Sequence, residues 1–199
     1  MGRLVYGVGT YSRGKFRASK NNKHTKVYRA WLNMLKRCYS EETQRTQPTY
    51  KGCTVCKEWL DFQNFAEWYS LNSDGDENLF IDKDLLSGDS KIYSPETCLL
   101  VTRTVNNFLL ASGKTRGRFL IGVAWSKQHG KFMSQCRNSI TGKNNHLGLY
   151  VNEVDAHLAW VRRKVEIGRL IAKEQKSEKV KSALLAWCDK LETNSINNR

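Results

Sequence analysis

A charged stretch in the middle of the chain has the composition of a reactive or binding loop. Residues 81–98, with the sequence IDKDLLSGDSKIYSPETC, hold four acidic side chains and two lysines around a glycine, a proline and a cysteine. A carboxylate in such a stretch can ligate a metal ion, and a lysine can hold a phosphate. Three interpretations follow from this composition: a catalytic hairpin, a binding loop, or a turn-rich piece of scaffold.

Lys83 stands between two acids in this stretch, and these neighbours limit the chemistry open to it. A lysine accepts a proton near neutral pH only where burial or nearby cations bring its pKa far down. Asp82 and Asp84 would instead keep Lys83 charged. The sequence therefore predicts that Lys83 holds a phosphate, or that the three residues form a salt-bridged turn.

The six cysteines are scattered along the chain, and one pair has the spacing of metal ligands. Cys53 and Cys56 form a CxxC motif, which needs two further ligands to complete a zinc site. Cys38 and Cys98 could supply them and give a four-thiolate Zn²⁺ site. The alternative is that all four are small buried thiols.

Positive charge indicates the class of partner. The net charge is +14, and residues 1–40 contain ten Lys or Arg side chains and no acid. An excess of this size attracts polyanions, so nucleic acid is the favoured partner. We expect residues 1–27 to form a basic N-terminal arm that contacts phosphates, with a solvated tail as the alternative.

Membrane association is not expected from the sequence. No apolar run approaches the roughly 20 residues that a membrane span needs, and the N-terminus lacks the apolar core of a signal peptide. We therefore expect a cytoplasmic protein that does not bind membranes.

Hydrophobic periodicity predicts the elements of the N-terminal half. Apolar residues at three- and four-residue steps predict a helix from Tyr28, which the polar run 41–50 should break. A second helix over 57–69 carries an aromatic stripe that we assign to the core: Trp59, Phe62, Phe65 and Trp68. Residues 79–86 and 91–98 read as two strands around a turn, and 99–112 as a helix.

The C-terminal half has the pattern of a small sheet followed by helices. Three strands are predicted over 118–125, 131–138 and 146–151, after a basic, glycine-bearing linker at 112–118. The alternation of the second strand places four side chains on one face: Lys131, Met133, Gln135 and Arg137. Asn152 and Ser177 are the expected N-caps of the two following helices.

Two parts of the chain resemble known families. Residues 28–110 resemble the HNH-type endonucleases of phages, many of them homing enzymes, through YRAWLNMLKRCY, YKGCTVCKEWLDFQNFAEW and IDKDLLSGDSKIYSPETC. Residues 119–173 resemble the AP2 DNA-binding domain through IGV, GKFMSQCR, LGLY and EVDAHLAW. This pairing of domains is itself common in phages, and it would place the protein in the cytoplasm of the host cell.

The resemblance implies an α+β protein with two small domains. Residues 28–111 would form a ββα-metal domain, similar to a His-Me finger, and residues 119–174 an AP2-like three-stranded antiparallel sheet packed on a helix. Residues 175–199 would add a C-terminal helix and tail. In the HNH family a strand Asp ligates Mg²⁺, a neighbouring His activates water, an Asn orients that His, and a helix residue completes the metal site.

Matched to that pattern, Asp82 and Asn106 occupy the two positions that would hold Mg²⁺. Lys83 stands where the general-base histidine should be, and Thr97 stands where the orienting asparagine should be. The histidines all lie outside residues 79–110: His24, His129, His146 and His157. The resemblance thus implies a nuclease hairpin that lacks its proton acceptor, and it leaves both metal-dependent phosphodiester hydrolysis and DNA binding without cleavage open.

The AP2-like segment implies that a sheet reads double-stranded DNA in the major groove. Four residues match the base- and phosphate-contacting positions of that family: Gln135, Arg137, Asn144 and His146. Five cations near them would hold phosphates without reading sequence: Arg116, Arg118, Lys127, Lys131 and Lys143. Two alternative functions remain. The first is a non-enzymatic regulator on a nuclease scaffold, acting as repressor or anti-defence factor. The second is an RNA-binding protein, which only the net charge favours.

Overall fold

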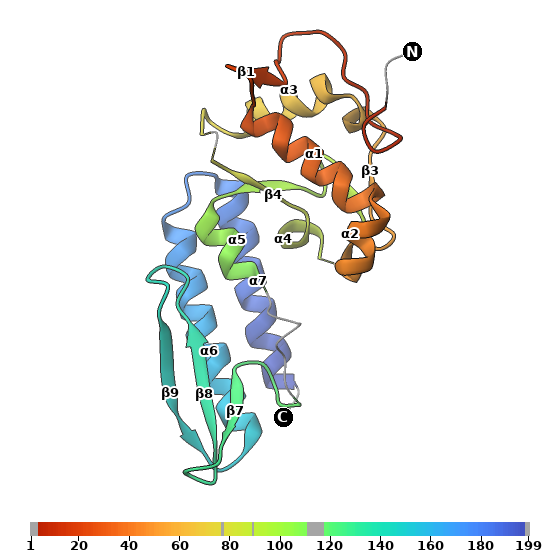
Figure 1. Cartoon of the computed structure of the whole chain (residues 1–199). Coiled ribbons are helices and arrows are strands. Elements are labelled where there is room, and N and C mark those ends of the chain that lie inside the picture. Colours follow the sequence, from red (N-terminus) through yellow and green to blue (C-terminus); the bar gives the residue numbers. More distant parts are fainter. Residues whose placement is uncertain (1–3, 77, 89, 111–117, 198–199) are drawn as a thin grey trace. The chain divides into compact units, whose positions relative to one another are not determined.

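The chain forms two compact units, Met1–Arg103 and Thr104–Arg199 (Figure 1). The computed structural model describes residues 4–76, 78–88, 90–110 and 118–197. Helices and short strands occur in both units, so the predicted α+β class is confirmed. Within the described residues, no helix combines the length and the apolar character needed to cross a bilayer.

The first unit consists of short helices and two-residue to three-residue strands. Its helices are α1 (Lys26–Tyr39), α2 (Glu41–Thr46), α3 (Phe62–Asn72) and α4 (Asp84–Ser87), with 3-10 turns at Pro48–Tyr50 and Glu58–Leu60. Its strands are β1 (Ser19–Lys20), β2 (Lys23–His24), β3 (Thr54–Val55), β4 (Phe80–Asp82), β5 (Ile92–Tyr93) and β6 (Leu99–Val101). They pair two by two rather than forming one large sheet.

Helix α1 confirms the predicted periodicity. The hydroxyl of Thr25 accepts a hydrogen bond from the Tyr28 N–H at 3.2 Å and starts the helix. Its apolar face is buried at Trp31, Met34, Leu35 and Cys38. The helix ends at Tyr39, just before the polar run 41–50 that was expected to break it. Ser40 then caps a second short helix, α2, where the sequence indicated an irregular segment.

The aromatic stripe lies in the core of the first unit, as predicted. Trp59, Phe62 and Phe65 are at most 1% exposed, and Trp68 packs partly buried against them. The indole N–H of Trp31 donates to the Trp59 carbonyl at 2.7 Å. This bond satisfies the polar atom of a fully buried ring and ties α1 to the segment before α3.

The described part of the basic N-terminal segment, residues 4–25, which we call the N-terminal layer, is hydrogen-bonded to the rest of the first unit, while most of its side chains are exposed. The Thr10 N–H donates to the Leu60 carbonyl at 2.8 Å, and the Phe16 N–H donates to the Gln63 side chain at 3.0 Å. Gly9 is buried so closely that an added Cβ would lie 2.5 Å from a methyl carbon of Leu35. Any larger residue at this point would force the buried side chains of Leu35 and Trp31 to shift.

The strand–turn–strand predicted over 79–98 is observed only in part, because the end of the first predicted strand forms helix α4 and the second is reduced to Ile92–Tyr93. Strand β4 ends at Asp82 and pairs antiparallel with β6, which the sequence assigned to a helix. Strand β5 pairs in parallel with β3 instead, with Thr54 opposite Ile92. A short apolar run such as 99–101 has no helical or strand period of its own, and tertiary burial decided its conformation.

The second unit contains a three-stranded antiparallel sheet in the order β7 (Val123–Ser126), β8 (Lys131–Arg137), β9 (Asn144–Tyr150). Its long helices are α6 (Glu153–Lys173), which packs on the sheet, and α7 (Glu178–Asn197), which packs on α6. The three predicted strands are thus observed. Both predicted caps are confirmed, since Asn152 accepts from the Asp155 N–H at 2.8 Å and Ser177 from the Val180 N–H at 3.4 Å.

Helix α5 (Arg103–Leu109) lies at the point in the sequence where the two units divide. Phe108 packs against Trp187 at 5.3 Å between ring centroids, and the ammonium of Lys164 donates to the Phe108 carbonyl at 2.6 Å. These contacts attach α5 to α6 and α7. The division therefore precedes the linker expected at 112–118, which, apart from Arg118, lies outside the described residues.

Candidate nucleic-acid interface

Helix α6 covers one face of the sheet of the second unit, and no described helix of this unit covers the other, which we call the uncovered face. On β8, Ser134 and Cys136 are buried, whereas Lys131, Gln135 and Arg137 are exposed. This alternation confirms the faces predicted from the sequence. The uncovered face is the surface on which the predicted base-contacting residues meet.

Cross-strand register gathers these residues into a block. Gln135 lies opposite His146, and Arg137 lies opposite Asn144. Directly opposed residues of an antiparallel pair point to the same side, with Cβ atoms about 4.5–5.5 Å apart. Four side chains able to hydrogen-bond to base edges or phosphates are therefore adjacent on the surface.

A β-bulge between β8 and β9 creates this arrangement. Ser134 pairs with Gly148, yet the next residue, Gln135, pairs with His146, so Leu147 is the extra residue. Without the bulge, Asn145 rather than Asn144 would lie opposite Arg137, and His146 would face α6. Gly148 has a φ of +126°, a backbone conformation that residues with a Cβ rarely adopt.

We expect Gly148→Ala to destabilise the second unit by about 1–2 kcal/mol, because alanine is strained at this φ. An added Cβ would lie no closer than 3.4 Å to Tyr150, so crowding is a minor part of the effect. Chemical denaturation measures the loss, and Gly130→Ala, at a positive φ in the β7–β8 turn, is the control for backbone strain alone. Only Gly148→Ala should also weaken DNA binding; equal effects on binding would contradict the role given to the bulge.

The predicted phosphate-binding cations occupy several places on the second unit: Lys143 directly precedes Asn144, whereas Lys127 and Lys131 lie at the β7–β8 turn, at the other end of β8 from Arg137. Arg118, Lys127, Lys131 and Lys143 are exposed, and none of them takes part in an ion pair between described residues. The guanidinium of Arg118 lies 4.8 Å from the centre of the Phe119 ring. Arg116 lies outside the described residues. The positive charge of the described cations is thus available to a polyanion.

Asp82, the predicted metal ligand, caps helix α4. Its Oδ1 accepts hydrogen bonds from the Leu85 N–H at 2.8 Å and the Asp84 N–H at 3.1 Å. Burial raises the pKa of Asp82, and the charge of Asp84 adds to the rise, while the two N–H donors act against it. Oδ1 of Asp82 is therefore occupied by the hydrogen bonds that cap α4. For Oδ2, no hydrogen bond to another described residue is found.

Lys83, in the position of the general base, is 6% exposed and forms an ion pair with Asp84. Burial acts to lower the pKa of Lys83, but the hydrogen bond and charge of Asp84 outweigh burial and leave that pKa raised. The ammonium therefore stays protonated at neutral pH, as the flanking acids predicted. In this conformation Lys83 neutralises the charge of Asp84.

The other two predicted catalytic residues, Thr97 and Asn106, lie in different units. Thr97 Oγ1 donates to the Ile92 carbonyl at 2.8 Å and accepts from the Ser94 N–H at 3.0 Å, which closes the turn before β6. Asn106 is half-buried on α5 in the second unit. The described part of the chain gathers no group of three or more His, Cys, Asp or Glu side chains able to hold a metal, so Mg²⁺ binding stays a prediction.

The cysteines predicted as zinc ligands belong to the core of the first unit or its margin. Cys38, Cys53 and Cys98 are at most 3% exposed, and Cys56 is half-buried. Burial raises the pKa of Cys38 and of Cys98 to about 12. Zinc binds thiolates, whereas these surroundings favour protonated thiols packed as small apolar groups. The Zn²⁺ site also stays a prediction.

We expect Asp82→Asn to increase stability at neutral pH. The folded-state pKa of Asp82 is raised, so the cost of the buried carboxylate is present above its titration range and vanishes below it. The variant should therefore have a higher urea midpoint than the wild type at pH 7, and the difference should close towards pH 3. Asp84→Asn is the matched control with the opposite sign, because it leaves the buried Lys83 without its partner.

Comparisons with protein families, with characterised proteins and with solved structures give no match to this chain. The HNH and AP2 resemblances consequently stay predictions.

Proposed function

We propose that this protein binds double-stranded DNA through the uncovered face of β7, β8 and β9. The observation that carries the proposal is the block of Gln135, Arg137, Asn144 and His146 on that face. The major groove, about 12 Å wide, admits β-strands, and Gln and Arg can form paired hydrogen bonds to adenine and guanine. The AP2-like motifs of the sequence agree with this docking mode.

Electrostatics supports the same partner. The net charge is +14. Among the described residues, neither the cations of residues 4–40 nor Arg118, Lys127, Lys131 and Lys143 of the second unit take part in an ion pair. Lys131 and Lys143 can hold phosphates while the block of Gln135, Arg137, Asn144 and His146 reads base edges. Affinity should therefore fall steeply with salt, as counterions released by each phosphate contact return to the DNA.

We further infer that the protein binds DNA without cutting it and acts as a regulator built on a nuclease-like segment. The support comes from residues 82–84: the lysine in the general-base position is buried, paired and protonated, and the carboxylate before it caps a helix. Hydrolysis of a phosphodiester needs a proton acceptor near neutral pKa. A repressor or anti-defence role requires only the DNA-binding face.

The experiment is incubation of supercoiled plasmid with the full chain and Mg²⁺, followed by a gel shift and a nicking assay on the same samples. We expect a salt-sensitive shift and no nicking above the background of Asp82→Ala. Nicking by the wild type that Asp82→Ala abolishes would contradict the regulator and establish Mg²⁺-dependent hydrolysis. A stronger shift with structured RNA than with duplex DNA would contradict the choice of partner.

A further inference from the structure

Three rings form a continuous band on the surface of the first unit, where the N-terminal layer meets α1. The Tyr28 ring lies 6.0 Å from the Tyr11 ring and 5.0 Å from the His24 ring, between centroids. Tyr11 is 47% exposed, His24 is exposed, and Tyr28 is half-buried. We call these three residues the aromatic platform.

The platform is held in place from beneath. Phe62 is fully buried and lies 5.8 Å from Tyr11 and 5.0 Å from Tyr28, between ring centroids. Tyr11 follows Thr10, whose N–H is bonded to the Leu60 carbonyl, and Tyr28 is in the capped first turn of α1. His24 is paired with Ser19 in the β1–β2 hairpin. Rings fixed in this way lose little conformational entropy when they bind a flat ligand.

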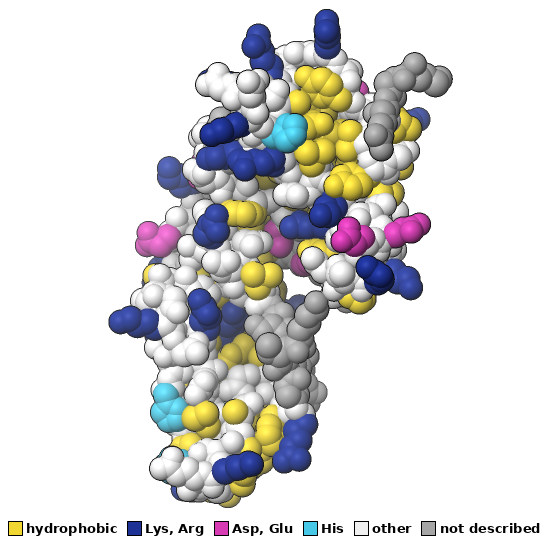
Figure 2. Space-filling model, viewed as in Figure 1, with side chains coloured by type: hydrophobic (Ala, Val, Ile, Leu, Met, Phe, Trp, Pro, Cys, Tyr) yellow, Lys and Arg dark blue, Asp and Glu magenta, His cyan; other side chains and the backbone are white. Residues whose placement is uncertain are grey.

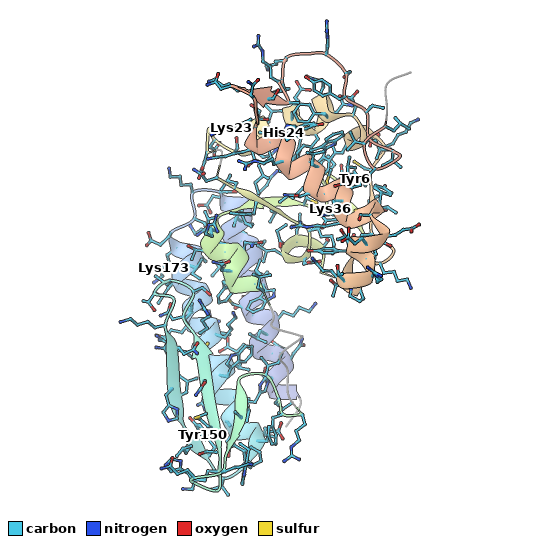
Figure 3. The ribbon with its side chains drawn as sticks, viewed as in Figure 1. Tyr6, Lys23, His24, Lys36, Tyr150 and Lys173 are labelled. Carbon is cyan, nitrogen blue, oxygen red and sulfur yellow. The ribbon has the colours of Figure 1, made fainter. Side chains whose placement is uncertain are left out.

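Cations flank the platform. Lys23 precedes His24 in β2 and is paired with Lys20, while Lys26 and Arg29 are in the first turn of α1. Figure 3 places Lys23 and His24 at the beginning of α1 and Lys36 further along that helix. Figure 2 shows a band of hydrophobic side chains on this unit with a histidine at its margin and Lys and Arg side chains around it.

Cations outnumber acids around the platform. Residues 4–40 contain no acid, and none of their cations forms an ion pair with another described residue. Asp61 lies beside Tyr11 in space, where its carboxylate accepts hydrogen bonds from the hydroxyl of Ser12. Packing of these rings into the core alone does not require cations around them. Exposed rings beside unpaired cations fit a ligand that is both flat and polyanionic.

We propose that the aromatic platform binds single-stranded nucleic acid, with bases stacked on Tyr11 and His24 and phosphates held by the neighbouring Lys and Arg side chains. Bases in a duplex are already stacked on one another and cannot lie on these rings, so the platform favours unpaired nucleotides. The site is separate from the sheet face proposed to bind duplex DNA and involves none of its residues.

The test measures fluorescence anisotropy of labelled dT12, U12 and a 12-base-pair duplex with the full chain. The double variant Tyr11→Ala, His24→Ala should bind dT12 at least about tenfold more weakly, since each stacked base contributes a several-fold gain. Binding of the duplex should change less than about twofold. Comparison of dT12 with U12 shows whether the ligand is DNA or RNA.

Two controls separate stacking from other effects. Tyr11→Phe keeps the ring and should keep the affinity for dT12. This conservative variant tests the stacking even if the double variant does not fold. Trp125→Ala removes a ring of the second unit that is 41% exposed and should leave dT12 binding unchanged. Loss of dT12 binding in Tyr11→Phe, an equal loss for the duplex, or no binding of dT12 and U12 by the wild type would overturn the proposal.

Discussion

Replacing Arg137 with alanine is expected to weaken binding to the preferred duplex by about 5- to 150-fold, or roughly 1–3 kcal/mol. Arg137 is exposed at the end of β8, opposite Asn144 on the uncovered face of the sheet. A guanidinium in that position can donate two hydrogen bonds to guanine, and alanine can donate none. The loss should be concentrated at one base position of the site.

The measurement is a binding titration on a duplex found by selection from random sequences. Arg162→Ala, an exposed arginine on α6 rather than on the sheet, is the matched control and should change affinity little. Lys131→Ala should weaken binding to all sequences alike and reduce the slope of log K against log salt by about 1. Equal affinity of Arg137→Ala and the wild type, or binding indifferent to salt, would contradict the proposed interface.

Trp31→Ala is expected to destabilise the first unit by about 3–5 kcal/mol, the largest effect of any single change considered. Trp31 is fully buried, its indole N–H is bonded to the Trp59 carbonyl, and its ring packs against Gly9. Alanine would leave a large cavity in the core and an unsatisfied carbonyl beside it. The loss should concern this unit alone, because the second unit has a core of its own.

Native-state hydrogen exchange followed by mass spectrometry measures the effect for each unit. Peptides from α1 and α3 should lose protection in Trp31→Ala, while peptides from β8 and α6 should keep it. Trp125→Ala, which removes a partly exposed ring, is the control and should change protection much less. Equal loss of protection in both units would show that the chain unfolds as one cooperative body.

The sequence predicted those elements whose apolar residues follow a clear period and whose ends carry caps. Helix α1, the three strands of the second unit and the caps Asn152 and Ser177 are of this kind. Local signals agree with the tertiary structure there, and each can be found within a window of about ten residues. The aromatic stripe from Trp59 was also assigned correctly to the core.

The errors fall where pairing partners are distant in sequence. Strand β5 pairs with β3, some 38 residues earlier, and β6 pairs with β4 across α4 and β5. The apolar run at Leu99 fits a buried strand and a buried helix equally well, and no local signal chooses between them. Parallel pairing of two-residue strands leaves no pattern that a sequence analysis could detect.

The site shows the same limit on a smaller scale. Gln135 and Arg137 could be placed on one face by alternation alone, but the position of Asn144 and His146 beside them depends on a bulge at Gly148. The burial of Lys83 and the exposed rings of Tyr11 and His24 were not predicted. They depend on how segments distant in sequence cover one another.

The close passage of Gly9 over Trp31 and Leu35 means that the N-terminal segment also contributes to the stability of the first unit. The same N-terminal segment that carries exposed lysines and arginines also covers the aromatic core of its unit. Proteolytic trimming could not strip the charge without uncovering that core, so a truncated product would be prone to degradation. The charge of this segment can therefore change without exposing the core only through exchange of its side chains.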